Sequence, residues 1–382
     1  MKIGVPKEIV SGETRVALAP SLVQALIRDK HEVLVEQGAG TAASFLDEQY
    51  TKAGANILSS ARAVYSESDL ILKVRPPLMS EVEFMREGKA YIGFLAPMAN
   101  PETVLALARR GVTAFSMEYI PRITRAQSMD ALTSMATVAG YKAVLLATEH
   151  LGKMLPLLMT AAGTIPPATI LVLGAGVAGL QAIATAKRLG AKVEAYDVRA
   201  AVKEQIKSLG ATFIEIESSE DAETKGGYAK EQSPEFIRKQ QEVLSSRMPK
   251  VNVVIATAQV FGKRAPVIIT EAMVKLLQPG SVIVDVAAEQ GGNCELTEPG
   301  KTVTRNGVTI IGATNLPASI PVDASMLYAK NVINLFKHLY PKFDSSPDFT
   351  DEIVSGACIT RGGEIVNEAV KGALQLDKKI VK

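Results

Sequence analysis

The spacing of apolar residues along the chain predicts short strands that alternate with helices. In the first 120 residues the strand-like, β-branched runs are 2–5, 31–37, 69–74, 89–96 and 112–119, and segments with helical spacing are 20–30 and 102–111. Such alternation is typical of a parallel sheet that is covered by helices.

A second round of alternation begins at Thr169. Its strand-like runs are 169–173, 192–197, 212–217, 251–258, 281–287 and 308–313, and its helical patterns are 180–190, 202–210, 234–246 and 269–280. Six strands in roughly 145 residues match the size of a doubly wound nucleotide-binding domain.

Two longer helical patterns, 128–151 and 323–339, join these halves, and the chain after the second pattern is expected to pack back on the first domain. We therefore predict an α/β protein with two doubly wound, parallel-sheet (Rossmann-like) domains separated by a cleft. The predicted outer domain is discontinuous, comprising 1–133 and 315–382, and the inserted domain comprises 134–314.

Composition narrows the class of protein. The chain has 382 residues, of which 47% are apolar and 21% charged, enough core-forming side chains for ordered domains. Lys and Arg number 42 against 40 Asp and Glu, which gives no electrostatic footprint for nucleic acid or an anionic membrane. The uncharged stretch 154–186 is interrupted by Pro156, by 166–167 and by glycines, so we expect no membrane span there.

The sequence Gly-Ala-Gly-Val-Ala-Gly at 174–179 carries the clearest chemical signal. It directly follows a predicted strand and precedes a helix, so Gly174, Gly176 and Gly179 predict a tight turn that brings a pyrophosphate to a helix N-terminus. Asp197 ends the next strand, where a carboxylate accepts both ribose hydroxyls and repels a 2′-phosphate, which favours NAD(H) over NADP(H). Arg199, two residues on, is a basic group that also suits a phosphate. The alternative is a simple turn with Asp197 at a solvated strand end.

A second candidate is the segment 121–136, which concentrates hydrogen-bonding side chains between the outer domain and the linking helix. Arg122, Arg125, Gln127 and Asp130 fall within nine residues of one another. We predict that these side chains face the cleft. The structural alternative is a helix N-terminus capped by Ser128, with Asp130 favourable to the helix dipole.

Other polar residues carry weaker signals. The charged segment 222–233 is interpreted either as a lid or as a disordered loop. Buried or idle thiols are expected at Cys294 and Cys358, structural roles at the three histidines, and no metal site. Two cysteines without paired spacing and a start without an apolar signal segment favour a reducing cytoplasm.

Over essentially its whole length the chain resembles the NAD(H)-binding domain I, or alpha-1 subunit, of proton-translocating nicotinamide nucleotide transhydrogenase. The segments that carry the resemblance are 6–20, 121–130, 159–168, 173–191, 197–210, 226–231 and 289–301. The resemblance implies that Arg122, Gln127 and Asp130 position the dihydronicotinamide ring. It also places Gly174, Gly176, Gly179, Asp197 and Arg199 in the nucleotide site and Tyr228 on a mobile loop that closes over it.

The related alanine dehydrogenase family, which shares the fold, implies a competing function. This sequence keeps Arg15 and Lys73 where that family has its pyruvate-binding Arg and Lys. It has Ala96 at that family's acid/base His, and Glu289 where that family has an Asp. Oxidative deamination needs a group to move protons, so the loss of the His favours transhydrogenation.

Hydride transfer between two nicotinamides moves no proton at the reacting carbon, so the resemblance implies a protein that only holds two rings in contact. One dinucleotide fingerprint implies that NADP(H) is bound by a partner subunit, and proton movement is expected in membrane-embedded subunits. The resemblance further implies a homodimer, cytoplasmic and peripheral on the inner face of the cytoplasmic membrane through its partners. The alternatives are a freestanding alanine-type dehydrogenase and a non-catalytic NAD-binding module.

Overall fold

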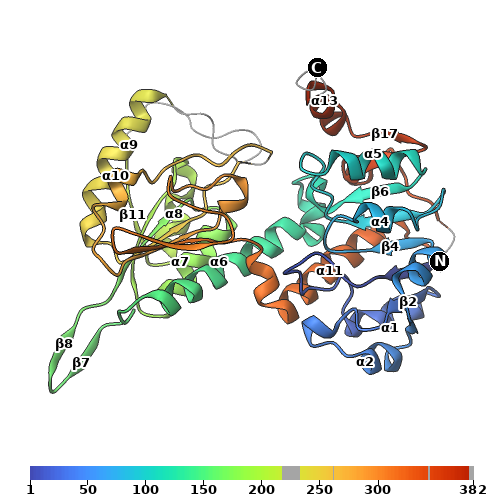
Figure 1. The fold of residues 1–382 in the computed structure, drawn as a ribbon, viewed down its shortest axis with the longest axis horizontal. Coiled ribbons are helices and arrows are strands. Elements are labelled where there is room, and N and C mark those ends of the chain that lie inside the picture. Colours follow the sequence, from blue (N-terminus) through green and yellow to red (C-terminus); the bar gives the residue numbers. More distant parts are fainter. Residues whose placement is uncertain (217–232, 261, 343–344, 378–382) are drawn as a thin grey trace. The chain divides into compact units, whose positions relative to one another are not determined.

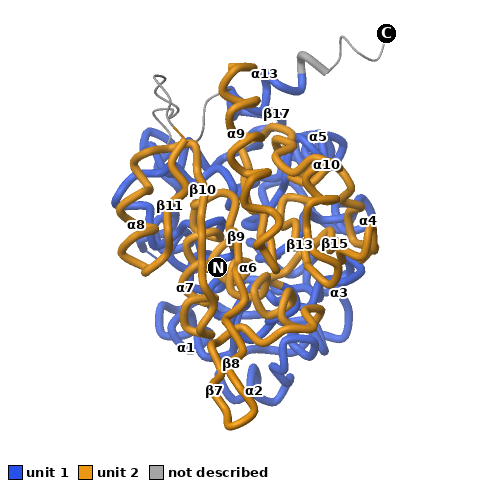
Figure 2. Tube along the Cα trace, turned by 90° about the vertical axis from the view of Figure 1, so that its left-hand side faces the viewer, with its two compact units in different colours: residues 1–135, 318–382 blue, residues 136–317 orange. Residues whose placement is uncertain are grey.

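The computed structural model describes residues 1–216, 233–260, 262–342 and 345–377 (Figure 1). The chain divides into two compact units. Unit 1 comprises Met1–Met135 with Ala318–Lys382, and unit 2 comprises Ala136–Pro317 (Figure 2). Each unit is built on one large and mostly parallel sheet with flanking helices, so the predicted α/β class with two doubly wound sheets is confirmed.

Unit 1 contains an eight-stranded sheet in the order β17-β16-β6-β5-β4-β1-β2-β3. Its strands are β1 (Lys2–Val5), β2 (Glu32–Glu36), β3 (Asn56–Leu58), β4 (Leu70–Leu72), β5 (Ala90–Gly93), β6 (Thr113–Ser116), β16 (Cys358–Arg361) and β17 (Glu364–Ile365). The segment from β3 to β6 is parallel, and β16 joins β6 antiparallel. The chain after 339 therefore returns to this sheet, as expected, although the sequence pattern did not predict β3, β16 or β17.

The helices of unit 1 connect these strands. They are α1 (Pro20–Arg28), α2 (Asp47–Lys52), α3 (Ala61–Glu67), α4 (Met79–Val82), α5 (Pro101–Arg109), α11 (Pro321–Leu339), α12 (Glu352–Ala357) and α13 (Glu368–Asp377). Three of them, α1, α5 and α11, begin with proline, which fits the first helical turn because its missing N–H has no partner there.

Unit 2 contains a seven-stranded sheet in the order β11-β10-β9-β12-β13-β15-β14. Its strands are β9 (Thr169–Leu173), β10 (Lys192–Tyr196), β11 (Thr212–Phe213), β12 (Val253–Ala256), β13 (Val282–Asp285), β14 (Thr302–Arg305) and β15 (Val308–Gly312). All are parallel except β14, an unpredicted strand that forms a hairpin with β15. The strand order reverses between β9 and β12, which is where ligands bind in open sheets of this kind.

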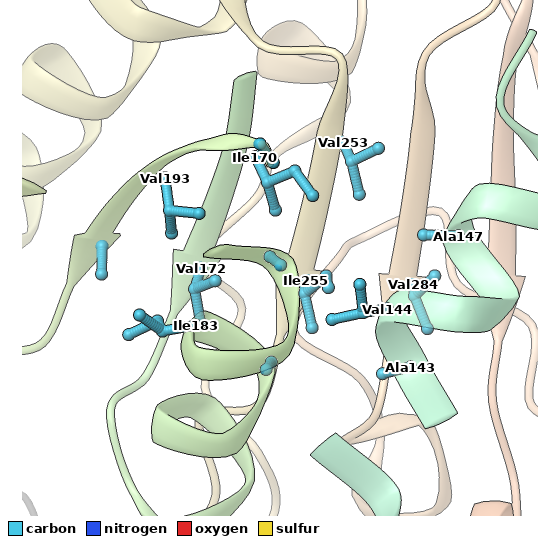
Figure 3. Packing of buried hydrophobic residues seen from close by; sticks show 14 of the residues in the cluster. Ala143, Val144, Ala147, Ile170, Val172, Ile183, Val193, Val253, Ile255 and Val284 are labelled. Carbon is cyan, nitrogen blue, oxygen red and sulfur yellow. The ribbon is translucent and has the colours of Figure 1, made fainter. Parts of the chain in front are cut away.

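Alternating side chains of the central strands enter two apolar layers. Ile170, Val172 and Ile255 face α6 (Ala131–His150), α7 (Val177–Arg188) and α8 (Lys203–Ser208), as the close view of this layer shows (Figure 3). Leu171 and Leu173 face α9 (Pro234–Arg247) and α10 (Glu271–Val274) instead. A parallel strand buried on both faces reads as a continuous apolar run, which explains the sequence of β9.

The helix predicted at 269–280 is mostly wrong, because only Glu271–Val274 forms an α-helix. The backbone N–H groups of Ile268 and Ile269 donate to the Asn293 carbonyl oxygen at 2.8 and 2.9 Å. This tie to a neighbouring loop holds the start of the segment in an extended conformation, and Thr270 then caps the short helix.

The apolar stretch 154–186 forms no long helix, which confirms that it is not a membrane-spanning helix. It contains the hairpin β7 (Leu158–Thr160) and β8 (Gly163–Ile165), then β9 and most of α7. Among the described residues, one helix, α6, is long and apolar enough to cross a membrane by length and composition. Core helices pass the same test, and Ala143, Val144 and Ala147 of α6 pack on the sheet of unit 2 (Figure 3).

We expect Ile255→Ala to lower the free energy of unfolding of unit 2 by about 2–5 kcal/mol, because it leaves a cavity between α6 and the sheet. The Ile255 side chain is 0% exposed. Thermal and denaturant unfolding measure the effect. Ile237→Ala on α9 is the matched control, since this side chain is 41% exposed and the change is expected to cost less than about 0.5 kcal/mol. Equal losses in the two variants would contradict the packing described for this layer.

Candidate functional site

The turn after β9 has room only for glycine at two of its three glycine positions. Gly174 has a φ of +89°, and a Cβ there would lie 2.9 Å from the Ala258 backbone nitrogen. A Cβ at Gly179 would lie 1.9 Å from the Gly174 carbonyl oxygen. At Gly176 a Cβ would meet nothing within 4 Å, so this position borders open space. The turn is therefore closed toward the protein and open on the side of Gly176.

Helix α7 begins at the open side of this turn. Gly176 is its N-cap residue, no side chain caps it, and no acidic residue lies in its first turn. The first N–H groups of a helix have no partner within the helix, and the helix dipole makes this end partially positive. The arrangement fits a phosphate group at the N-terminus of α7.

Asp197 lies beside the same turn, directly after β10. Its Oδ2 accepts a hydrogen bond from the Ala175 N–H at 2.7 Å, and its side chain is largely buried. Arg199 forms a two-pronged ion pair with it, in which Nε donates to Oδ1 at 2.9 Å and Nη2 donates to Oδ2 at 2.8 Å. The structure thus brings the glycine turn, Asp197 and Arg199 into one cluster, where the guanidinium partly offsets the carboxylate charge.

Three further residues support the turn, and the sequence analysis missed them. The Thr257 hydroxyl donates to the Gly174 carbonyl oxygen at 2.9 Å. The next residue, Ala258, exchanges hydrogen bonds with the side chain of buried Asn293, at 2.9 and 2.8 Å. The Asn293 N–H in turn donates to Asp285 at 2.7 Å, and burial raises the pKa of that carboxyl group. Their shared signal is position, since Thr257 follows β12 and Asp285 ends β13, the strands next to the reversal of strand order.

The second candidate segment forms a 3₁₀ helix, Thr124–Met129, in unit 1. Arg122, Arg125 and Gln127 are exposed on this segment. Asp130 accepts hydrogen bonds from the Thr133 N–H at 2.8 Å and from its hydroxyl at 2.6 Å, so Asp130 caps α6. The capping alternative is therefore right in kind but wrong in the residue, which is Asp130 and not Ser128. Capping uses Asp130 without involving Gln127.

Arg125 anchors this segment to the rest of unit 1. Its Nη1 donates to Asp351 at 2.6 Å, and His338 contacts the other oxygen of that carboxylate at 3.1 Å. Asp351 also caps α12 through the N–H groups of Ile353 and Val354. Although partial burial acts to raise it, the hydrogen bonds from His338 and Arg125 hold the pKa of Asp351 well below its usual range. Arg125 thus fixes the backbone from which Arg122 and Gln127 extend. Tyr228 lies outside the described residues.

The two basic residues shared with alanine dehydrogenases are already paired inside unit 1. Arg15 forms a salt bridge with Glu13 at 2.6 Å, and Lys73 contacts Glu81 at 2.7 Å and Glu8 at 3.4 Å. All five side chains are buried. Burial raises the pKa of Glu8 against the opposing charge of Lys73.

The positions of that family's acid and base differ from this cluster. Ala96 has a φ of +41°, and its N–H donates to Glu118 at 2.8 Å. Burial raises the pKa of Glu118. Glu289 lies in unit 2 and is exposed in the short 3₁₀ helix Ala288–Gln290. The methyl group of Ala96 can neither donate nor accept a proton.

Neither cysteine has the surroundings of a reactive thiol. Both Cys294 and Cys358 are buried, and burial raises the pKa of each to about 11. At neutral pH the protonated form, a poor nucleophile, therefore predominates. Within the described ranges, no group of three or more His, Cys, Asp or Glu side chains is placed to hold a metal ion.

Comparison with known proteins matches both halves of the chain. The family described as alanine dehydrogenase/PNT matches through its N-terminal domain over residues 4–139 and its C-terminal domain over residues 143–368. The first of the chains that make up the NAD(P) transhydrogenase alpha subunit of Rhodospirillum rubrum is 49% identical over 97% of this chain and 99% of its own. An alanine dehydrogenase of Methanococcus maripaludis is 32% identical over 98% of this chain and 97% of its own.

A solved structure of the transhydrogenase from Sinorhizobium meliloti has a TM-score of 0.85 and 41% identity, and the match covers 97% of this chain and 100% of the other. The resemblance inferred from the sequence motifs is therefore confirmed, and it extends to the fold of both units.

We expect Asp351→Asn, which removes the charge but keeps a capping oxygen, to lower the free energy of unfolding at pH 7 by about 0.5–1 kcal/mol. A carboxyl group whose pKa is lowered by folding stabilises the protein fully above its unfolded pKa, and this stabilisation is lost as pH falls toward the folded pKa. The gap between wild type and variant is therefore expected to narrow below about pH 4. Denaturant unfolding from pH 7 to 3 measures it, with Glu352→Gln on α12 as control. A constant gap would contradict the interpretation.

Proposed function

This chain belongs to the alanine dehydrogenase/PNT family, and we propose that it is the NAD(H)-binding catalytic subunit of a proton-translocating NAD(P) transhydrogenase. One observation carries the proposal beyond family membership. The uncapped N-terminus of α7, the glycine turn and the Asp197 carboxylate lie together at the strand reversal of unit 2. These are the groups that hold the pyrophosphate and adenosine ribose of a dinucleotide.

The charges around Asp197 support NAD(H) as the bound nucleotide. Asp197 already accepts from Ala175 and Arg199, yet a carboxylate has about four acceptor positions and keeps capacity for ribose hydroxyls. A 2′-phosphate would approach the same carboxylate and be repelled. Arg199 reduces this repulsion without removing it, because its guanidinium is held against Asp197 by two hydrogen bonds.

The bound nucleotide supplies the hydride, and the protein is proposed to supply position. We assign Arg122, Gln127 and Asp130 to the nicotinamide end of the site. Arg125 holds their segment through Asp351, and Asp130 fixes the start of α6. No proton has to move at the reacting carbon, so exposed amide and guanidinium donors suffice where a dehydrogenase needs an acid and a base.

A partner subunit is required for this reaction, since the chain has one dinucleotide fingerprint and transfer needs two nicotinamides. We propose that NADP(H) is bound by that partner and that proton movement belongs to membrane-embedded subunits. The chain would then be cytoplasmic and attached peripherally to the inner face of the membrane through these subunits. A homodimer is part of the same proposal and rests on the family resemblance, as does a role for Tyr228 in closing over the nucleotide.

A freestanding alanine-type dehydrogenase is the second candidate, favoured by the 32% identity to the Methanococcus maripaludis enzyme and by Arg15 and Lys73. Two observations weigh against it. Ala96 replaces the acid/base residue, and carboxylates already neutralise both basic residues. A non-catalytic NAD-binding module remains the outcome if no hydride is transferred with any NADP(H)-binding partner.

We expect the chain to bind NADH far more tightly than NADPH, and Asp197→Ala to weaken NADH binding by about 1–3 kcal/mol, the usual cost of losing a charged hydrogen bond. Titration calorimetry measures both affinities. Glu204→Ala is the control, because it removes an exposed carboxylate of α8 in the same unit. Equal affinities of the wild type for NADH and NADPH would count against the assignment of Asp197.

The proposed function itself is tested by mixing the chain with an NADP(H)-binding transhydrogenase domain and following the reduction of an NAD analogue by NADPH. We expect Gln127→Ala to slow transfer on the order of 10²-fold, since a misplacement of about 1 Å has that effect. NADH affinity and the melting temperature should change little, because Gln127 is exposed.

Gln24→Ala on α1, another exposed glutamine of unit 1, is the matched control for the transfer assay. An unchanged rate in Gln127→Ala would remove Gln127 from the site. The same preparation with L-alanine and NAD⁺ separates the candidates. Turnover on the order of 10 s⁻¹, a typical enzyme rate, would establish the dehydrogenase instead.

A further inference from the structure

Helix α6 and the first turn of α7 meet backbone to backbone at Gly140. Gly140 is buried within α6, beside the small side chains of Ala139 and Ala143 that pack on the core of unit 2. A Cβ at Gly140 would lie 2.1 Å from the Ala178 carbonyl oxygen, and 2.9 and 3.0 Å from its carbonyl carbon and Cα. All three are backbone atoms, so no rotamer change relieves the contact. Glycine is a poor helix former, so α6 gives up helix propensity at this position for the close approach.

Thr257 closes the same assembly on another side. Its hydroxyl donates to the Gly174 carbonyl oxygen, and a Cβ at Gly179 would lie 3.1 Å from that hydroxyl oxygen. Its N–H also donates to Leu173 at 2.8 Å, which ties β12 to the end of β9. The turn, the start of α7 and the Thr257 hydroxyl are therefore packed with no space between them.

We propose that Gly140 and Thr257, neither of which belongs to the glycine fingerprint, are positioning residues for the pyrophosphate of the bound nucleotide. They act through the protein backbone. Gly140 sets the place of the first α7 turn, and Thr257 sets the place of the Gly174 peptide from which the turn begins. This inference rests on the proposed function, because it assumes that a diphosphate binds at the N-terminus of α7.

Asp197 determines which ligands should respond. Its carboxylate is held by the Ala175 N–H and by Arg199, whereas Gly140 packs on Ala178 and Thr257 bonds to Gly174. A shift of the first α7 turn should therefore weaken ligands that carry a diphosphate and spare a ligand recognised by its ribose alone. Loss of one charged hydrogen bond corresponds to a weakening of about 10–100-fold.

The experiment compares Gly140→Ala with Gly372→Ala in NADH and adenosine binding and in the transfer assay. Gly372 is the matched control because it lies in helix α13 and a Cβ there would meet nothing within 4 Å. We expect Gly140→Ala to raise the Kd for NADH about 10–100-fold, to leave adenosine binding within about twofold, and to raise KM for NADH more than it lowers kcat. Gly372→Ala should change none of these.

A second pair of variants decides the matter if Gly140→Ala does not fold. Thr257→Val keeps the shape but removes the hydroxyl, and Thr257→Ser restores the hydroxyl. We expect Thr257→Val to weaken NADH about tenfold or more without affecting adenosine, and Thr257→Ser to recover most of that affinity.

The outcomes separate this inference from the proposed function. Wild-type NADH affinity in folded Gly140→Ala and in Thr257→Val overturns the inference and leaves the proposed function standing. An equal loss of NADH and adenosine binding also overturns it, because the residues would then support the unit as a whole. A wild-type chain that binds no NADH overturns both.

Discussion

In unit 2 the backbone passes so close to itself after β9 that one methyl group at Gly179 would lie 1.9 Å from the Gly174 carbonyl oxygen. The parallel strands direct their carboxyl ends to this point, and the strand order reverses there, so the edge is open beside Gly176. The N-terminus of α7, the Asp197 carboxylate and the Thr257 hydroxyl all take their places from this approach. A ligand that needs several backbone N–H groups at once then finds them already arranged, which lowers the entropy lost on binding.

Charge in this protein is placed by pairing. Asp197 is held by Arg199, Asp351 by Arg125 and His338, and Lys73 by Glu8 and Glu81. The first two pairs lie at the candidate functional segments and are partly accessible, so a ligand can replace or extend their hydrogen bonds. The third is fully enclosed, where removal of one partner would leave a buried charge unpaired and is costly.

The sequence predicted the long central strands because β-branched runs buried on both faces are unambiguous, as in 169–173 and 281–287. It missed β3, β16 and β17, which are short and lie toward sheet edges. It also missed β14, although Asn306 and Gly307 have φ values of +52° and +75° and form the kind of two-residue turn that marks a hairpin. At the site, the glycines and Asp197 were found because their spacing is local. Thr257, Asn293 and Gly140 act through contacts between distant segments, which local spacing does not record.

Both units have the same order in their first six strands, with the reversal between the first and the fourth. What differs is the connection after the first strand. In unit 2 it is the tight turn 174–176, whereas in unit 1 it is the long segment 6–19, which buries Glu8, Glu13 and Arg15. Two of these three side chains are carboxylates, and Glu118 adds a third buried carboxyl group in unit 1. A polyanion is therefore disfavoured in unit 1, and the stoichiometry that follows is one dinucleotide per chain despite two sheets of like topology.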